Sequence, residues 1–255
     1  ARDLRKPDAP VQELVSTFEA AYEFIGAADG RFYVRTDDGA ERYRVVSIDP
    51  AKPAKSNWRE VLPQTNATLV SANLVDKLLI ANRLRDARSE VEAYDLKGKR
   101  VREIALPSLG TATGFGGSTA SSETFFSFAS YTTPGTIYRH DTRRGTTTVF
   151  RAPKVGFESG RYETRQVFYP SKDGTKIPMF IVHKKGLVLN GSNPTYLYGY
   201  GGFDVSLEPA FSPANIVWME MGGVYAQPNL RGGGEYGKEW HDAGRLKNKQ
   251  NVFDD

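Results

Sequence analysis

A tyrosine held between glycines is the residue best placed to do chemistry in this chain. Tyr200 lies in the run Gly-Tyr-Gly-Gly-Phe at residues 199–203, directly after the apolar and aromatic residues 196–198. Residues 196–198 predict a short buried strand, and the glycines allow a backbone turn that other residues resist. We therefore expect a rigid turn at the carboxyl end of a strand, carrying the Tyr200 phenol and the Phe203 ring, where α/β proteins often bind ligands.

A serine nucleophile is not recognisable in the sequence. Enzymes of the α/β-hydrolase fold place their serine in G-x-S-x-G, on a sharp strand-to-helix turn. The nearest run, Gly-Gly-Ser-Thr-Ala at residues 116–120, lacks the last glycine and lies among short β-type segments. We interpret it as a turn. His140 and His183 end predicted strands and His241 follows Trp240 in a predicted helix, so we interpret all three as structural or surface residues.

Composition excludes several other kinds of site. The chain has no cysteine, which rules out disulfides, thiolate nucleophiles and cysteine-based zinc sites. It contains no H-E-x-x-H pattern and no carboxylates clustered at ligand spacing, so we expect no metal and no cofactor. The net charge is +4, but basic and acidic residues are interspersed, which argues against nucleic acid as a partner. No apolar run approaches a membrane span.

One rival interpretation is a dinucleotide-binding module. The residues from Gly232 to Gly237 satisfy G-x-G-x-x-G after a predicted strand, and Asp254 lies 20 residues beyond Gly234, as in that fingerprint. Two features weigh against this alternative. The second parallel strand of a complete unit does not follow, and an expected ion pair between Arg231 and Glu235 would occupy the loop that a pyrophosphate needs.

The first part of the chain is a repeat of short β-type runs and turns. Three sets of residues keep a constant step of 46 positions: Tyr33, Leu79 and Phe125; Val45, Val91 and Ile137; Asp49, Asp95 and Asp141. Each unit reads as a strand, a turn, a strand ending near aspartate, another turn and a trailing strand. A period near 45 residues with about four strands is typical of propeller blades, and an ordinary β-sandwich is the alternative.

The repeat predicts two domains. Residues 1–160 are interpreted as the last blades of a β-propeller, and because three blades cannot close a ring, further blades are expected before residue 1. Residues 161–255 change pattern: a hairpin at 165–183, a strand at 196–198, a helix at 215–221 and a strand at 224–227. A hairpin followed by strand, helix and strand is how an α/β-hydrolase domain begins. The predicted fold class is therefore mixed, propeller blades followed by the start of an α/β-hydrolase domain.

Several runs in the second part resemble the prolyl oligopeptidases, a family of serine peptidases. They cover most of residues 165–255 and are, in chain order: Tyr-Pro-Ser-Lys-Asp-Gly-Thr-Lys-Ile-Pro-Met-Phe at 169–180, Leu-Tyr-Gly-Tyr-Gly-Gly-Phe at 197–203, Asn-Leu-Arg-Gly-Gly-Gly-Glu-Tyr-Gly at 229–237, Trp-His at 240–241 and Asn-Lys-Gln-Asn at 248–251. The related oligopeptidase B usually has Gly-Ser-Tyr where this chain has Gly-Gly-Phe at 201–203. That difference favours the proline-specific branch.

The resemblance carries expectations about function. It implies a seven-bladed propeller inserted into a peptidase domain that cleaves short peptides after proline, working as a monomer without a cofactor. Tyr200 would donate a hydrogen bond in the oxyanion hole, since a tyrosine phenol keeps its proton at neutral pH, and Phe203 would line the substrate cleft. The catalytic serine, acid and histidine of the family would follow Asp255. The 255 residues alone are thus predicted to be inactive, with a non-catalytic propeller binding module as a further alternative.

Overall fold

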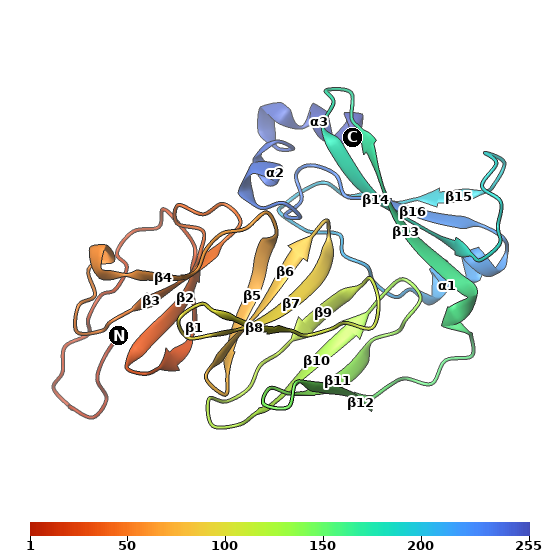
Figure 1. Ribbon diagram of the computed structural model, residues 1–255. Coiled ribbons are helices and arrows are strands. Elements are labelled where there is room, and N and C mark those ends of the chain that lie inside the picture. The colour runs from red at the N-terminus through yellow and green to blue at the C-terminus, as the bar shows by residue number, and fades with distance from the viewer.

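Three antiparallel sheets occupy the first part of the computed structural model, which describes residues 1–255 (Figure 1). Each sheet has four strands in sequential order. The first contains β1 (Tyr22–Ala28), β2 (Arg31–Thr36), β3 (Arg44–Ile48) and β4 (Arg59–Leu62); the second β5 (Thr68–Val75), β6 (Leu78–Arg85), β7 (Arg88–Asp95) and β8 (Arg100–Glu103); the third β9 (Thr111–Gly114), β10 (Glu123–Ala129), β11 (Thr136–Asp141) and β12 (Thr146–Arg151). They stand side by side as three blades, as the repeat predicts.

The blades pack face to face through alternating apolar side chains. Tyr33 and Val45 of the first blade are buried against Leu69 and Leu79 of the second. The second and third blades bury a similar cluster that includes Phe126. Every other residue of a strand faces the same neighbour, so each central strand contributes to both interfaces.

The aspartates of the repeat form the turns after the third strand of each blade. The Asp95 carboxylate accepts hydrogen bonds from the N–H groups of Lys97 (2.8 Å) and Lys99 (2.9 Å). Asp49 and Asp141 accept equivalent bonds from the N–H groups two residues further on, both at 2.9 Å. Aspartate favours such turns because its side chain binds nearby backbone donors. The predicted repeat of aspartates is therefore confirmed, and in each blade the aspartate stabilises the turn that follows the third strand.

The expected equivalence of Tyr33, Leu79 and Phe125 is wrong by one residue in the second blade. Tyr33 and Leu79 lie in the same cluster and face each other from neighbouring blades. The β6 residue that faces the third blade is Ile80. The β2–β3 connection has seven residues, 37–43, whereas the β6–β7 connection has only 86 and 87, and a one-residue shift turns a strand side chain to the opposite face.

A mixed sheet follows the blades. Its strands, in spatial order, are β13 (Tyr162–Pro170), β14 (Lys176–Lys184), β16 (Val224–Pro228) and β15 (Thr195–Leu197). The helices are α1 (Pro213–Glu220), α2 (Lys238–Asp242) and α3 (Gln250–Asp254), with short 3-10 turns η1 (Lys55–Asn57), η2 (Ser159–Arg161) and η3 (Leu246–Asn248). β13 and β14 form the expected hairpin, and β15 runs parallel to β16 with α1 in the connection, which is the opening of an α/β sheet.

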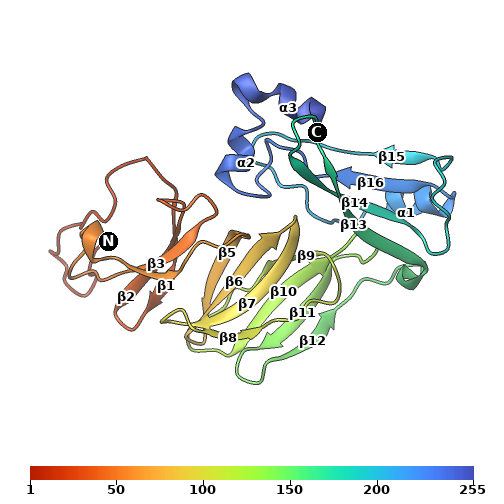
Figure 2. The ribbon, with the colours of Figure 1, turned by 45° about the horizontal axis from the view of Figure 1, so that its top comes forward.

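Helix α1 covers one face of the mixed sheet. Ile216 and Met219 of α1 pack on Phe180 and Tyr225, and the same cluster includes Tyr131 from the β10–β11 connection of the third blade. The blades and the mixed sheet therefore share a core at this point. In Figure 2 the mixed sheet and its helices lie along one side of the row of blades. None of the helices combines the length and apolar character needed to cross a membrane.

Candidate active site

The turn that carries Tyr200 begins where β15 ends. β15 pairs with β16 through Thr195, Tyr196 and Leu197, and the N–H of Tyr198 extends this pairing by donating to the Ala226 carbonyl at 2.9 Å. The next residues leave the sheet at the carboxyl ends of both strands. The turn therefore lies where the sequence predicts it, but the expected burial of the strand is wrong, because β15 is an exposed strand at the edge of the sheet.

Close packing fixes the backbone of this turn. Gly201 has φ of +63°, and a Cβ there would lie 2.4 Å from the Val252 side chain and 2.8 Å from the Arg231 carbonyl oxygen. Only glycine fits such a position. Phe203 and Asp204 also have positive φ, 54° and 59°, which costs a non-glycine residue about 1 kcal/mol or more. The surrounding contacts must therefore hold the turn.

A second loop, residues 229–237 after β16, packs against the turn that carries Tyr200. The N–H of Asp204 donates to the Gly232 carbonyl at 3.1 Å. The carboxylate of Glu235 accepts hydrogen bonds from the N–H of Leu207 (2.9 Å) and from the Asn229 amide (3.2 Å). Burial raises the pKa of Glu235 to about 6. The two loops form one packed unit.

The expected Arg231–Glu235 ion pair is wrong. Arg231 instead binds Asp255, with its Nη2 2.5 Å from Oδ1, and Asp173, with its Nη1 2.6 Å from Oδ2. The Asp255 side chain is fully buried. The Arg231 guanidinium lowers the pKa of Asp173. This network ties the β13–β14 turn, the second loop and α3 together.

The Tyr200 turn, residues 199–204, lies at the boundary between the blades and the mixed sheet. A polar cavity of about 360 Å³ there is lined by Tyr43 and Thr68 from the blades and by Asp204 and His241 from the other side. Thr68 also donates from Oγ1 to the Glu235 carbonyl at 3.2 Å. The side chains of Tyr200 and Phe203 are 45% and 84% exposed. Both rings are therefore available to a ligand.

The glycines from Gly232 to Gly237 do not present a free backbone to a dinucleotide. A Cβ on Gly233 would meet the Glu235 carboxylate at 2.2 Å, and one on Gly234 would meet the Asp204 carbonyl oxygen at 2.7 Å. A pyrophosphate needs open N–H groups at a helix N-terminus. Here the chain itself, including a buried carboxylate, occupies that space.

The histidines lie apart from one another. His140 is buried in the third blade, where its Nδ1 lies 2.8 Å from the Thr147 hydroxyl. His183 is buried in β14 beside the Lys184 carbonyl, and Nδ1 of His241 lies 2.8 Å from the Gly232 carbonyl oxygen. Only His241 is near the candidate site, and its ring faces backbone rather than a nucleophile.

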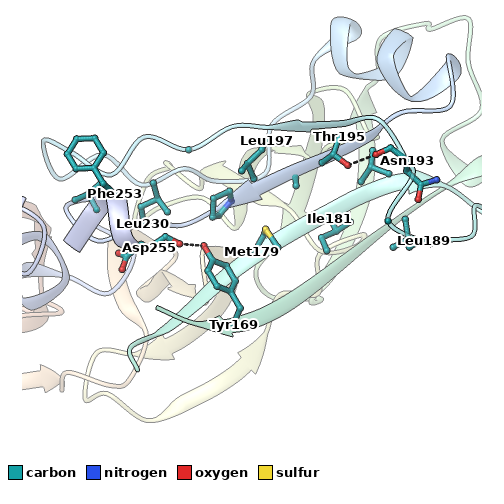
Figure 3. Close-up of a pocket in the computed structure, with 16 residues that line it drawn as sticks. Tyr169, Met179, Ile181, Leu189, Asn193, Thr195, Leu197, Leu230, Phe253 and Asp255 are labelled. Carbon is teal, nitrogen blue, oxygen red and sulfur yellow. Dashed lines mark hydrogen bonds between the residues drawn. The ribbon is translucent and has the colours of Figure 1, made fainter. Parts of the chain in front are cut away.

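An apolar groove of about 920 Å³ covers the face of the mixed sheet opposite α1 (Figure 3). Met179 and Ile181 of β14 point into it, with Leu197 of β15 and Leu230 beside them, and the Tyr169 hydroxyl at its edge donates to the Asp255 carbonyl at 2.5 Å. Gly199 is the part of the Tyr200 turn that lines this groove. The groove is a sheet face rather than a cleft with convergent polar groups.

Known families match both parts of the chain. The model described as the prolyl oligopeptidase N-terminal β-propeller domain matches residues 1–153, and that of the prolyl oligopeptidase family matches residues 209–255. The chain belongs to the prolyl oligopeptidase family. Its blades and mixed sheet are accordingly the propeller domain and the start of the peptidase domain of a prolyl oligopeptidase.

Relatives with known names agree with this assignment. The chain is 45% identical over 242 residues to a prolyl endopeptidase of Elizabethkingia miricola, covering 95% of this chain and 34% of the relative. For a prolyl endopeptidase of Dictyostelium discoideum the identity is 36% over 260 residues, covering 96% of this chain and 34% of the relative. The chain thus spans about a third of the length of these relatives.

Solved structures of prolyl oligopeptidases have the same fold. A prolyl endopeptidase studied for inter-domain dynamics superposes with a TM-score of 0.89 at 48% identity, covering 94% of this chain and 36% of that chain. Prolyl oligopeptidase B of Galerina marginata, bound to a 35mer hydrolysis and macrocyclization substrate, superposes with a TM-score of 0.89 at 33% identity. The match covers 98% of this chain and 36% of that chain.

Proposed function

We propose that this chain is part of a prolyl endopeptidase, a serine peptidase that cleaves short peptides after proline. The observation that carries the proposal is the Tyr200 turn. It leaves the carboxyl end of β15, where an α/β-hydrolase supplies its second oxyanion donor, and Asp204 at its end lines a cavity shared with the blades. The chemistry would need a serine, an acid and a histidine from further residues of a longer polypeptide.

In this proposal Tyr200 stabilises charge that develops during acyl transfer. The serine oxygen attacks the carbonyl carbon of the proline residue, the histidine takes the serine proton, and the carbonyl oxygen becomes an alkoxide. The Tyr200 phenol donates a hydrogen bond to that alkoxide. Collapse expels the amine, which receives the proton from the histidine, and water then releases the acyl group. Phe203 offers its exposed ring to the apolar part of the peptide.

The domain assignment is part of the same proposal. We place the propeller in residues 1–160 and the peptidase domain in residues 161–255, with the link between the end of β12 at Arg151 and the start of β13 at Tyr162. The groove of Figure 3 supports a peptidase domain that continues beyond these residues, because α/β sheets are covered on both faces. The enzyme would act as a monomer on short proline-containing peptides.

A pair of activity measurements tests the proposal. The natural full-length polypeptide is expected to hydrolyse a chromogenic Gly-Pro substrate much faster than its Gly-Ala counterpart, and a serine-directed phosphonate should abolish this activity. The isolated 255 residues should show none, since the nucleophile, acid and base would be missing. Turnover by the isolated residues, or equal rates on the two substrates, would contradict the proposal.

A further inference from the structure

Lys249 makes a hydrogen bond to the Tyr200 turn, and this bond has no part in the proposed chemistry described above. It precedes α3, and its side chain reaches back to the Tyr200 turn, where the Nζ donates to the Gly201 carbonyl oxygen at 2.7 Å. The two residues are 48 positions apart in the sequence. A hydrogen bond from a charged donor is roughly twice as strong as one between neutral groups.

The carbonyl that Lys249 binds is that of Gly201, the residue directly after Tyr200. The ammonium and the edge of the Tyr200 ring both lie close to Gly202: a Cβ built there would be 3.8 Å from the Lys249 Nζ and 3.9 Å from the Tyr200 Cε1. Holding the Gly201 carbonyl restrains the backbone of the turn at the residue next to Tyr200, and the edge of the Tyr200 ring lies beside the same stretch of backbone.

The turn needs such a restraint because of its backbone conformation. Phe203 and Asp204 have positive φ, and non-glycine residues in that region persist only where the surroundings hold them. The hydrogen bond from Asp204 to the Gly232 carbonyl anchors the far end of the turn. The Lys249 ammonium anchors the near end, next to the catalytic phenol.

We propose that Lys249 is a positioning residue for the oxyanion hole, holding the Gly201 carbonyl so that the Tyr200 hydroxyl is aimed at the developing alkoxide. This inference rests on the proposed function, because it assigns Lys249 a role only if Tyr200 is the donor. A misplaced catalytic group loses rate even when it is chemically intact. The effect belongs in kcat, since the alkoxide exists only in the transition state and the intermediate.

The test is a double-mutant cycle in the full-length polypeptide with a Gly-Pro anilide. Lys249→Met keeps the apolar stem and removes the charge and the donor; we expect kcat to fall about 10-fold, with little change in KM. Lys249→Arg restores a charged donor and should recover most of the lost rate. Lys247→Met is the matched control, because Lys247 is exposed two residues away, and its kcat should equal that of the wild type. Thermal melting confirms that each variant is folded.

Combining the variants with Tyr200→Phe separates the two hypotheses. If Lys249 acts through the phenol, Lys249→Met should have almost no further effect once the hydroxyl is gone. A wild-type kcat in Lys249→Met, or the same 10-fold loss in the Tyr200→Phe background, would overturn the role of Lys249 while leaving Tyr200 as the donor. An unchanged kcat in Tyr200→Phe itself would instead overturn the oxyanion role, and the positioning role with it.

Discussion

Single residues at the site differ in how far their roles can be read from sequence. The turn that carries Tyr200 and Phe203 is predictable, because glycines mark it, and the structure has that turn at the end of β15, whereas the roles of the two rings belong to the proposal. The partners of Arg231 were not identifiable. Asp173 and Asp255 lie 58 and 24 positions away, and only tertiary packing brings them to the guanidinium. Nearby Glu235 was the obvious but wrong choice.

Glu235 gives a prediction about pH and stability. Its pKa in the folded protein is about 6, above the usual 4.5, because its carboxyl group is buried and Asp204 lies nearby. The folded state therefore binds the proton more tightly than the unfolded chain. The contribution of Glu235 to the free energy of unfolding falls as pH rises from about 4.5 to about 6, and stays low above that.

Glu235→Gln removes this penalty, because the amide is neutral at every pH. We expect it to stabilise the protein by about 2 kcal/mol at pH 8, and by progressively less as the pH falls toward 4.5. Urea denaturation of both forms at pH 8 and pH 4.5 measures the difference. Glu239→Gln, at an exposed position in α2, should change stability little at either pH. A gain that grows at low pH would contradict the account.

At the scale of elements, the repeat predicted the strands better than it predicted their faces. The third-strand residues Val45 and Val91 do face the following blade, as expected. Leu79 does not match Tyr33, because the two-residue β6–β7 turn shifts the register of β6. A constant step in sequence locates a strand, but the lengths of its connections decide which side chains point into each interface.

The contact between neighbouring blades depends on a glycine in the β7–β8 turn. Gly98 has φ of +86°, and a Cβ there would lie 2.0 Å from the Val61 carbonyl oxygen of β4. Gly98→Ala should therefore lower the free energy of unfolding by about 2–4 kcal/mol, combining left-handed strain with a backbone clash.

Gly30 in the β1–β2 turn is the matched control for this prediction. It has φ of +73° and no atom within 4 Å of a built Cβ, so Gly30→Ala should cost only about 1–2 kcal/mol. Urea unfolding midpoints of the two variants measure the difference. Equal losses in the free energy of unfolding for the two variants would show that the neighbouring blade does not pack closely against Gly98.

At the scale of the whole molecule, the blades and the mixed sheet meet around the candidate site. The Tyr236 hydroxyl donates to the Asp86 carboxylate of the second blade at 2.7 Å, and the Thr111 hydroxyl of the third blade donates to the Pro209 carbonyl at 2.8 Å. The repeat and the later motifs predicted both folds, but no local pattern could show which loops touch. These contacts place the loop of residues 229–237, on which the Tyr200 turn packs, beside the blades.

The most direct test of the account is the kcat of Tyr200→Phe in the full-length polypeptide, measured with a Gly-Pro anilide whose poor leaving group keeps chemistry rate-limiting. The substitution keeps the ring and removes only the hydroxyl. Loss of one oxyanion donor is expected to lower kcat by roughly 10²–10³, about 2.7–4 kcal/mol, with a smaller change in KM. The thermal melting temperature should stay close to that of the wild type. An unchanged kcat in the folded variant would contradict the claim that this chain supplies an oxyanion donor.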